Sequence, residues 1–202
     1  MAAYATLVEL CAAAKSCTAC DLSKQRTHVV PGEGNEHAQV MFIGEGPGYN
    51  EDQQGRPFVG AAGKLLDELI ASIGFKRSDV YIANVVKCRP PGNRDPLPGE
   101  IDACAHWLDQ QIALIKPKVI VTLGRFSMAK FLPKETISKV HGSPRKLNGI
   151  AILPVHHPAA ALYQASLKAT LLADFKKIPA LLKEAALPVQ AAQPPPRQMK
   201  LL

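Results

Sequence analysis

Short apolar runs alternate with amphipathic segments along most of the chain. Four runs have the length and aliphatic content of buried strands: QVMFIG (39–44), DVYIANVV (79–86), KVIVTLG (118–124) and GIAILPV (149–155). Apolar positions at helical spacing predict helices over 4–15, 62–75, 100–115 and 170–184. The last of these segments contains Pro179, which predicts a kink or a break.

Strands that alternate with helices form parallel sheets covered on both faces. We therefore expect an α/β fold of three layers, α/β/α, around a four-stranded parallel sheet. Ligands of such sheets bind at the carboxyl ends of the strands. Three segments follow predicted strands, and we expect them to converge on one crevice: GEGPGYNEDQQGRPFVG (44–60), NVVKC (84–88) and HHPAA (156–160).

The composition limits the class of protein without identifying its function. A chain of 202 residues, 47% of them hydrophobic, predicts one globular domain, which we place at 1–185. The proline-rich segment 186–202 is typical of a disordered tail. The net charge of +7 is compatible with nucleic acid but does not require it. No apolar run is long enough to cross a bilayer, so we expect a soluble, cytoplasmic protein with no membrane partner. We also expect a monomer.

The five cysteines suggest a metal site, because thiols in a reducing compartment are more often ligands or buried groups than disulfides. Cys17 and Cys20 form a CxxC at the end of a predicted helix. Cys88 begins a proline-rich loop and Cys104 lies early in the next helix, so both are able to reach the same point. Four thiolates suit either zinc or an iron–sulfur cluster, and the spacing does not separate the two. Cys11 is expected to be an unliganded thiol.

Three longer segments carry a resemblance to a known family. In this order, GEGPGYNEDQQGRPFVGAAGKLL, YIANVVKCRPPGNRDPLPGE and PVHHPAAAL closely resemble the iron–sulfur-containing family 4 uracil-DNA glycosylases. The resemblance runs from the CxxC to the last helix and implies the three-layer fold described above. It also implies a [4Fe-4S] cluster held by Cys17, Cys20, Cys88 and Cys104. The activity implied is removal of uracil from single- or double-stranded DNA by hydrolysis of the N-glycosidic bond, which leaves an abasic site.

The resemblance gives the loop residues roles at a flipped uracil. Phe58 is expected to stack on the base, and the side-chain amide of Asn84 to offer a donor and an acceptor to the uracil edge. His157 is expected to place an imidazole donor near the uracil O2 and stabilise the departing anion. Gly46 and Gly48 allow close approach of the backbone to the base.

The carboxylate at the sugar is less well defined. Glu45 is the leading candidate to position the attacking water or to offset the oxocarbenium charge. Glu51 and Asp52 are rivals for this role. The family usually carries acids where this chain has Tyr49 and Asn50, and this departure leaves the identity of the base open.

Residues outside the pocket are candidates for DNA contacts. Leu162 or Tyr163 is available as a wedge for the vacated stack, although the AAAL sequence equally suits the start of a helix. Lys139, His141 and Arg145 lie in a charged loop and are expected near phosphates. His141 stands where relatives often carry arginine.

Other classes of function agree less well with the sequence. A sister group traps uracil-DNA covalently through a histidine in a KRRIH sequence, but the corresponding stretch here reads KCRPPGNRDP and has no histidine. A non-catalytic nucleotide-binding module or an electron-transfer protein gives no reason for Phe58, Asn84 and His157 to converge. Of the adjacent histidines, His157 is preferred as the active-site residue, and His156 is expected to face the other way.

Overall fold

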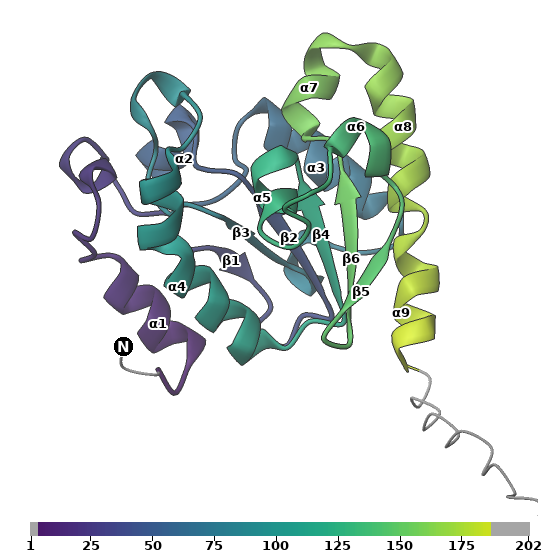
Figure 1. The fold of residues 1–202 in the computed structure, drawn as a ribbon, viewed down its shortest axis with the longest axis horizontal. Coiled ribbons are helices and arrows are strands. Elements are labelled where there is room, and N and C mark those ends of the chain that lie inside the picture. The colour runs from purple at the N-terminus through teal and green to yellow at the C-terminus, as the bar shows by residue number, and fades with distance from the viewer. Residues whose placement is uncertain (1–3, 187–202) are drawn as a thin grey trace, which may run out of the picture.

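The computed structural model describes residues 4–186, and a six-stranded sheet runs through its centre (Figure 1). The strand order is β1-β3-β2-β4-β6-β5. The strands are β1 (Glu33–Gly34), β2 (Val40–Gly44), β3 (Tyr81–Asn84), β4 (Val119–Leu123), β5 (Arg145–Leu147) and β6 (Ile150–Val155). The predicted tail lies outside the described residues from position 187 onward.

The sheet is mixed, and this corrects the predicted four-stranded parallel sheet. Strands β3, β2, β4 and β6 correspond to the four predicted strands and run parallel to one another. At the edges, β1 pairs with β3 and β5 pairs with β6, both antiparallel. The edge strands were missed because they are two and three residues long, too short to show a period of two.

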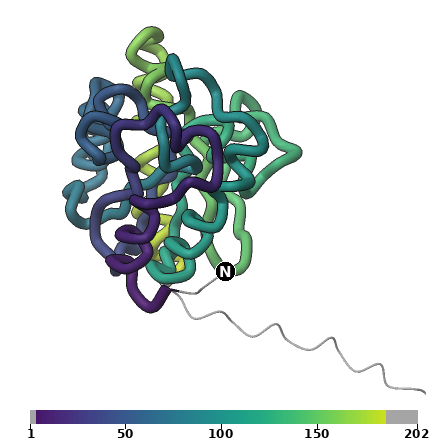
Figure 2. Tube along the Cα trace, turned by 90° about the vertical axis from the view of Figure 1, so that its left-hand side faces the viewer, coloured from purple at the N-terminus to yellow at the C-terminus, as the bar shows by residue number. Residues whose placement is uncertain are grey.

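Helices cover both faces of the sheet. The α-helices are α1 (Leu7–Ala14), α2 (Tyr49–Gln54), α3 (Ala61–Ala71), α4 (Pro98–Ile115), α5 (Arg125–Ala129), α6 (Ile137–Val140), α7 (Pro158–Tyr163), α8 (Ala165–Phe175) and α9 (Ile178–Ala186). On one face, α1 and α4 lie side by side (Figures 1 and 2) and pack on alternate strand residues such as Met41 and Ile43. On the other face, α3, α8 and α9 pack on the intervening residues such as Phe42.

The predicted helices are present with shifted ends. The helix predicted over 4–15 begins at Leu7, because Thr6 caps it in a capping box with Glu9. The segment 170–184 is broken as predicted, with α8 ending at Phe175 and α9 beginning at Ile178. Proline is tolerated in the first turn of a helix, which is where Pro179 lies in α9.

The described helices include none that is long and apolar enough to span a membrane.

The carboxyl ends of β2, β3 and β6 lead into the segments that carry most of the predicted site residues. Two of these segments contain short helices, α2 within the glycine-rich loop and α7 directly after β6. The fold thereby brings predicted site residues from three distant parts of the chain to one edge of the sheet.

Candidate active site

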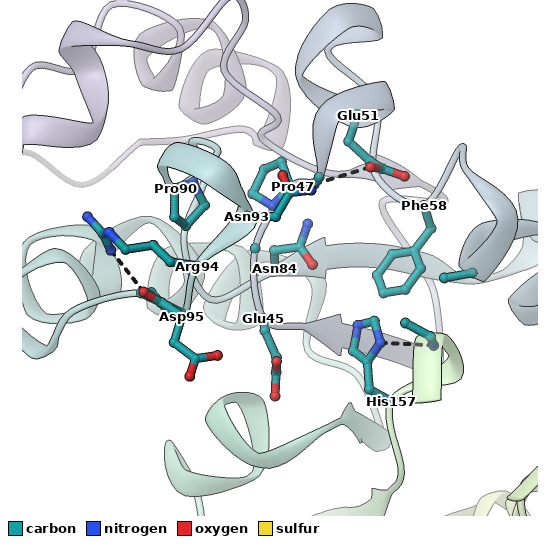
Figure 3. Close-up of a pocket in the computed structure, with 15 residues that line it drawn as sticks. Glu45, Pro47, Glu51, Phe58, Asn84, Pro90, Asn93, Arg94, Asp95 and His157 are labelled. Atoms are coloured by element: carbon teal, nitrogen blue, oxygen red, sulfur yellow. Dashed lines mark hydrogen bonds between the residues drawn. The ribbon is translucent and has the colours of Figure 1, made fainter. Parts of the chain in front are cut away.

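The three segments that follow β2, β3 and β6 meet around a cavity of about 330 Å³ (Figure 3). The carboxyl-end rule for parallel sheets predicted this meeting. The predicted site residues that line the cavity are Glu45, Gly46, Gly48, Glu51, Phe58, Asn84 and His157. A further wall comes from residues 93–96, for which the sequence predicted no role.

The ring of Phe58 is buried in one wall of the cavity. Its centroid lies 5.7 Å from that of the His157 ring, with an interplanar angle of 26°. Phe58 has a φ of 52°, in the left-handed region, where a non-glycine residue costs about 1–3 kcal/mol. The Arg77 guanidinium supports this conformation by donating to the Phe58 carbonyl at 3.3 Å. A flat apolar surface held in this way is suited to stacking on a planar ring.

Glu51 ties the two ends of the glycine-rich loop together. Its carboxylate accepts hydrogen bonds from the backbone N–H groups of Gly48 (3.1 Å), Val59 (2.9 Å) and Gly60 (3.0 Å). These bonds occupy both carboxylate oxygens and hold the backbone next to Phe58. Glu51 therefore lines the cavity while it also positions the loop.

Asp52 points away from the cavity. It is 2% exposed, and its Oδ1 accepts from the backbone N–H groups of Thr27 (2.9 Å) and His28 (3.4 Å). Its backbone carbonyl lies 2.9 Å from Nδ1 of His28. These contacts attach α2 to the preceding segment of the chain, so the structure does not bring Asp52 to the site with its neighbour.

Asn84 presents an unpartnered donor to the cavity. It is the last residue of β3 and is 2% exposed, and its Nδ2 has no hydrogen-bond partner within residues 4–186. Gly44 makes room for the amide: a Cβ at this position would clash with Oδ1 of Asn84 and lie 2.7 Å from the Phe58 ring. Leaving a buried amide donor unpaired costs free energy, so this donor indicates a ligand with an acceptor.

Glu45 lines the cavity near Asn84 and His157, with its carboxylate directed away from Asn84 (Figure 3). One carboxylate oxygen accepts from the Phe126 N–H at 3.0 Å, at the start of α5. Burial raises the pKa of Glu45 above its ordinary value, against the opposing effect of that hydrogen bond. Gly124, with a φ of 96°, allows Glu45 and His157 to approach, since a Cβ there would meet both side chains. The carboxylate is thus anchored through one oxygen in a partly apolar site.

His157 is the N-cap of α7, and this fixes its tautomer. Its Nδ1 accepts a hydrogen bond from the Ala159 N–H at 3.1 Å (Figure 3). A neutral imidazole that accepts through Nδ1 carries its proton on Nε2. Burial lowers the pKa of His157 to about 4, so the ring is neutral at physiological pH. The arrangement provides a neutral Nε2–H donor.

His156 faces the other way, as predicted. Its ring centroid lies 4.6 Å from that of His141, and burial lowers the pKa of His156. His141 is itself held by Asp174, whose Oδ2 lies 2.9 Å from the His141 Nδ1. Lys177 also contacts this buried carboxylate, at 3.0 Å. His141 is therefore part of a charged cluster and not a free side chain.

The other predicted DNA contacts lie outside the cavity. The AAAL sequence forms most of α7, and its Leu162 is 47% exposed, with Tyr163 after it 91% exposed. The structure is thus compatible with both interpretations of this segment, a wedge for the vacated stack and the start of a helix. Lys139 lies in the short helix α6, and Arg145 is exposed on the edge strand β5.

The predicted cysteine ligands line one small cavity between the N-terminal segment and α4: Cys17, Cys20, Cys88 and Cys104. Nitrogen donors point at three of the four sulfurs, at 3.4 Å (Trp107 Nε1), 3.2 Å (Arg26 Nη1) and 3.3 Å (the Lys87 N–H). No group of His, Cys, Asp or Glu in residues 4–186 has a geometry that would hold a single metal ion.

The chemistry of these thiols bears on what the cavity can hold. Burial raises the pKa of Cys104 to about 11 and raises that of Cys88 as well. Such groups remain thiols at neutral pH unless a positively charged centre stabilises the thiolates. Cys11 lies apart, with its Sγ 3.7 Å from the Tyr81 hydroxyl. Four thiols that line one cavity, three of them facing nitrogen donors, suit a thiolate-bound group.

Comparisons with known proteins cover most of the chain. The sequence model of the uracil DNA glycosylase superfamily matches residues 31–182. A type-4 uracil-DNA glycosylase of Archaeoglobus fulgidus is 50% identical over 173 residues, covering 81% of this chain and 86% of the relative. That of Sulfurisphaera tokodaii is 53% identical over 173 residues, covering 81% and 79%. That of Thermotoga maritima is 49% identical over 175 residues, covering 84% and 91%.

Proposed function

Because the chain belongs to the uracil DNA glycosylase superfamily, we propose that it is a DNA repair enzyme that removes uracil from DNA. The reaction is hydrolysis of the N-glycosidic bond of a flipped-out nucleotide, which leaves an abasic site. One observation carries the proposal: the buried, unpartnered Nδ2 of Asn84 shares a cavity with the Phe58 ring and the His157 donor. The relatives named as type-4 uracil-DNA glycosylases support it independently.

Selection of uracil follows from the hydrogen-bonding pattern of Asn84. Uracil offers O4 as an acceptor and N3–H as a donor, which match the Nδ2 donor and the Oδ1 acceptor of the amide. Cytosine offers an amino donor and an N3 acceptor, so the same amide would face like groups. A site built around one pattern rejects the other because its buried polar groups are left unpaired. Phe58 supplies stacking that does not depend on the base.

His157 acts on the leaving group. As the bond breaks, negative charge develops on the uracil ring, and a donor near O2 stabilises it. A neutral Nε2–H suffices, and the helix cap that fixes the tautomer also orients the ring. Because the donor is held in place before reaction, little reorganisation is needed at the transition state.

Glu45 is our choice for the carboxylate that positions the water and offsets the charge on the sugar. One of its oxygens is anchored by α5, and burial favours proton acceptance from a water molecule. Glu51 is assigned to holding the loop around Phe58, since both of its oxygens bind backbone N–H groups. Asp52 is left out of the mechanism because it lies outside the cavity.

For the DNA backbone we propose contacts from Lys139, His141 and Arg145, with Leu162 entering the vacated stack. The exposure of Leu162 and Arg145 supports this assignment. The domain proposed to carry the activity is 1–185. It is proposed to act as a cytoplasmic monomer on both single- and double-stranded DNA.

The cysteine cavity is proposed to hold a [4Fe-4S] cluster. A cluster spreads its thiolate ligands over several iron atoms and supplies the positive charge that buried thiolates require. Its ligands would be Cys17, Cys20, Cys88 and Cys104, and the N–H donors at three of these sulfurs support this choice. The role is structural, since this cavity is separate from the one that contains Asn84 and joins the N-terminal segment to α4.

An end-labelled oligonucleotide with one uracil tests the function. After incubation in EDTA and treatment with alkali, cleavage at the uracil position is expected for single strands and for U·G and U·A pairs. A matched thymine oligonucleotide should stay intact, and His157→Ala should slow cleavage. A complex that survives denaturing electrophoresis without base release would indicate a trapping protein instead. Failure of the purified protein to release uracil from any of these substrates would refute the proposal.

A further inference from the structure

Lys87 is a buried lysine that the proposed mechanism does not use. It lies three residues after Asn84 and is 2% exposed. Its Nζ donates hydrogen bonds to the Asn84 carbonyl at 2.9 Å and to Oε1 of Gln111 at 2.6 Å. Burying an ammonium group is costly even when it is hydrogen-bonded, so a lysine here calls for an explanation beyond packing.

Helix α4 holds Lys87 at both ends. The Lys87 backbone N–H donates to the sulfur of Cys104 at 3.3 Å, while its Nζ contacts Gln111. These two residues are seven apart in α4 and therefore lie on the same face of the helix, two turns from each other. Gln111 is in turn fixed, since its amide donates to the Pro31 carbonyl at 2.8 Å and to the Tyr81 hydroxyl at 3.2 Å.

The other contact of Lys87 ends at the active site. Asn84 is the last residue of β3, so the direction of its side chain depends on how its peptide is held where the strand ends. The Lys87 ammonium binds the carbonyl of this residue from inside the protein. Lys87 itself does not line the cavity, which excludes direct contact of its side chain with a base there.

We propose that Lys87 is a positioning residue for uracil recognition: it fixes the backbone of Asn84 against α4 so that the amide keeps its orientation in the cavity. The inference rests on the proposed role of Asn84. It implies that uracil recognition depends on a hydrogen-bonded chain that begins at the cysteine-bearing helix. A displacement of about 1 Å in a positioned group is enough to reduce a rate by about a hundredfold.

A double-mutant cycle tests this inference. Lys87→Met keeps the length of the side chain and removes the donor. In an otherwise unchanged protein, we expect it to reduce single-turnover uracil release by about tenfold to a hundredfold. It should weaken inhibition by free uracil by about tenfold and narrow the preference for uracil over cytosine. If Lys87 acts through Asn84, Lys87→Met should slow the Asn84→Ala protein by less than about twofold, because coupled residues are not additive.

Two controls separate positioning from general damage. In the His157→Ala background, Lys87→Met should exert its full effect, since that donor acts at a different atom of the base. Lys130→Met removes another lysine that packs on α4, through Asp109 at 2.6 Å, and should leave both the rate and the preference unchanged. Iron content and circular dichroism should match the unmodified protein in every variant used.

The outcomes are distinguishable. Equal slowing by Lys87→Met with and without Asn84 would overturn the inference while leaving the recognition role of Asn84 intact. A harmless Asn84→Ala would overturn both. If Lys87→Met does not fold, the same cycle is run with Lys87→Gln, whose amide is too short to reach both oxygens. If Lys87→Gln slowed uracil release equally with and without Asn84→Ala, the inference would be overturned in the same way.

Discussion

Lowering the pH distinguishes the contributions of the two proposed catalytic side chains, because the mechanism needs a neutral His157 and an ionised Glu45. Burial lowers the pKa of His157 to about 4, from an ordinary value near 6.5. That difference makes protonation in the cavity about 3 kcal/mol less favourable than in water, at about 1.4 kcal/mol for each pH unit. At pH 7 about one ring in a thousand is charged. The uncharged Nε2–H donor is therefore the working species.

The raised pKa of Glu45 sets the lower pH limit of the proposed activity. Burial raises its pKa, so its carboxylate is protonated at a higher pH than an ordinary glutamate, and before His157 gains a proton. A protonated Glu45 cannot accept a proton from water. Activity should thus be complete above the raised pKa of Glu45 and fall as the pH drops through it. The acid limb of the rate profile reports Glu45 and not His157.

Single-turnover rates between pH 5 and 8.5 check this reasoning. Glu45→Gln should be slow and nearly independent of pH over this range. His157→Ala should be slower than the unmodified protein by about a hundredfold, as for loss of one oxyanion-type donor, and should keep the acid limb. If the rate profile of Glu45→Gln kept an acid limb with the same midpoint, the assignment of that limb to Glu45 would be wrong. A histidine NMR signal that titrates near pH 6.5 in the unmodified protein and is absent from His157→Ala would refute the lowered pKa of His157.

Three further predictions follow from the same geometry. Serine at any of the four clustered cysteines should lower iron and sulfide content, measured colorimetrically, whereas Cys11→Ser should leave both unchanged; stoichiometric zinc after anaerobic purification would contradict this. Gly44→Ala should slow uracil release by more than about tenfold, because its Cβ would displace the Phe58 ring and the Asn84 amide, while Gly99→Ala, with no atom within 4 Å, should not. Removal of residues 187–202 should leave the single-turnover rate within twofold, and a larger loss would place part of the function in that segment.

The centre of the fold was predictable because its strands are buried on both faces. Continuous apolar runs such as 39–44 are long enough to be recognised, and they correspond to the parallel strands. The edge strands β1 and β5 are short and partly or fully exposed, so their pairing depends on tertiary contacts that no local pattern records. The helix α2 was missed for a related reason: six residues inside a glycine-rich loop show no helical period.

The division of labour among the acids was not predictable from the sequence. Glu51 and Asp52 are adjacent, and neighbouring residues of a helix point about 100° apart. One carboxylate turns to the loop around Phe58 and the other to Thr27 and His28, yet both fit the same motif. The role of each carboxylate depends on its hydrogen-bond partners, and these partners are distant in sequence.

The choice between adjacent histidines has a clearer physical basis. Strand β6 ends at Val155 and α7 begins at Pro158, which leaves His157 at the N-cap of α7, a place usually held by side chains with an acceptor oxygen. There the acceptor is Nδ1, which is used by the helix, so the proton must stay on Nε2. His156 lies one position earlier, where its ring packs against His141. The start of a two-turn helix thus determines both which imidazole faces the cavity and which of its nitrogens donates.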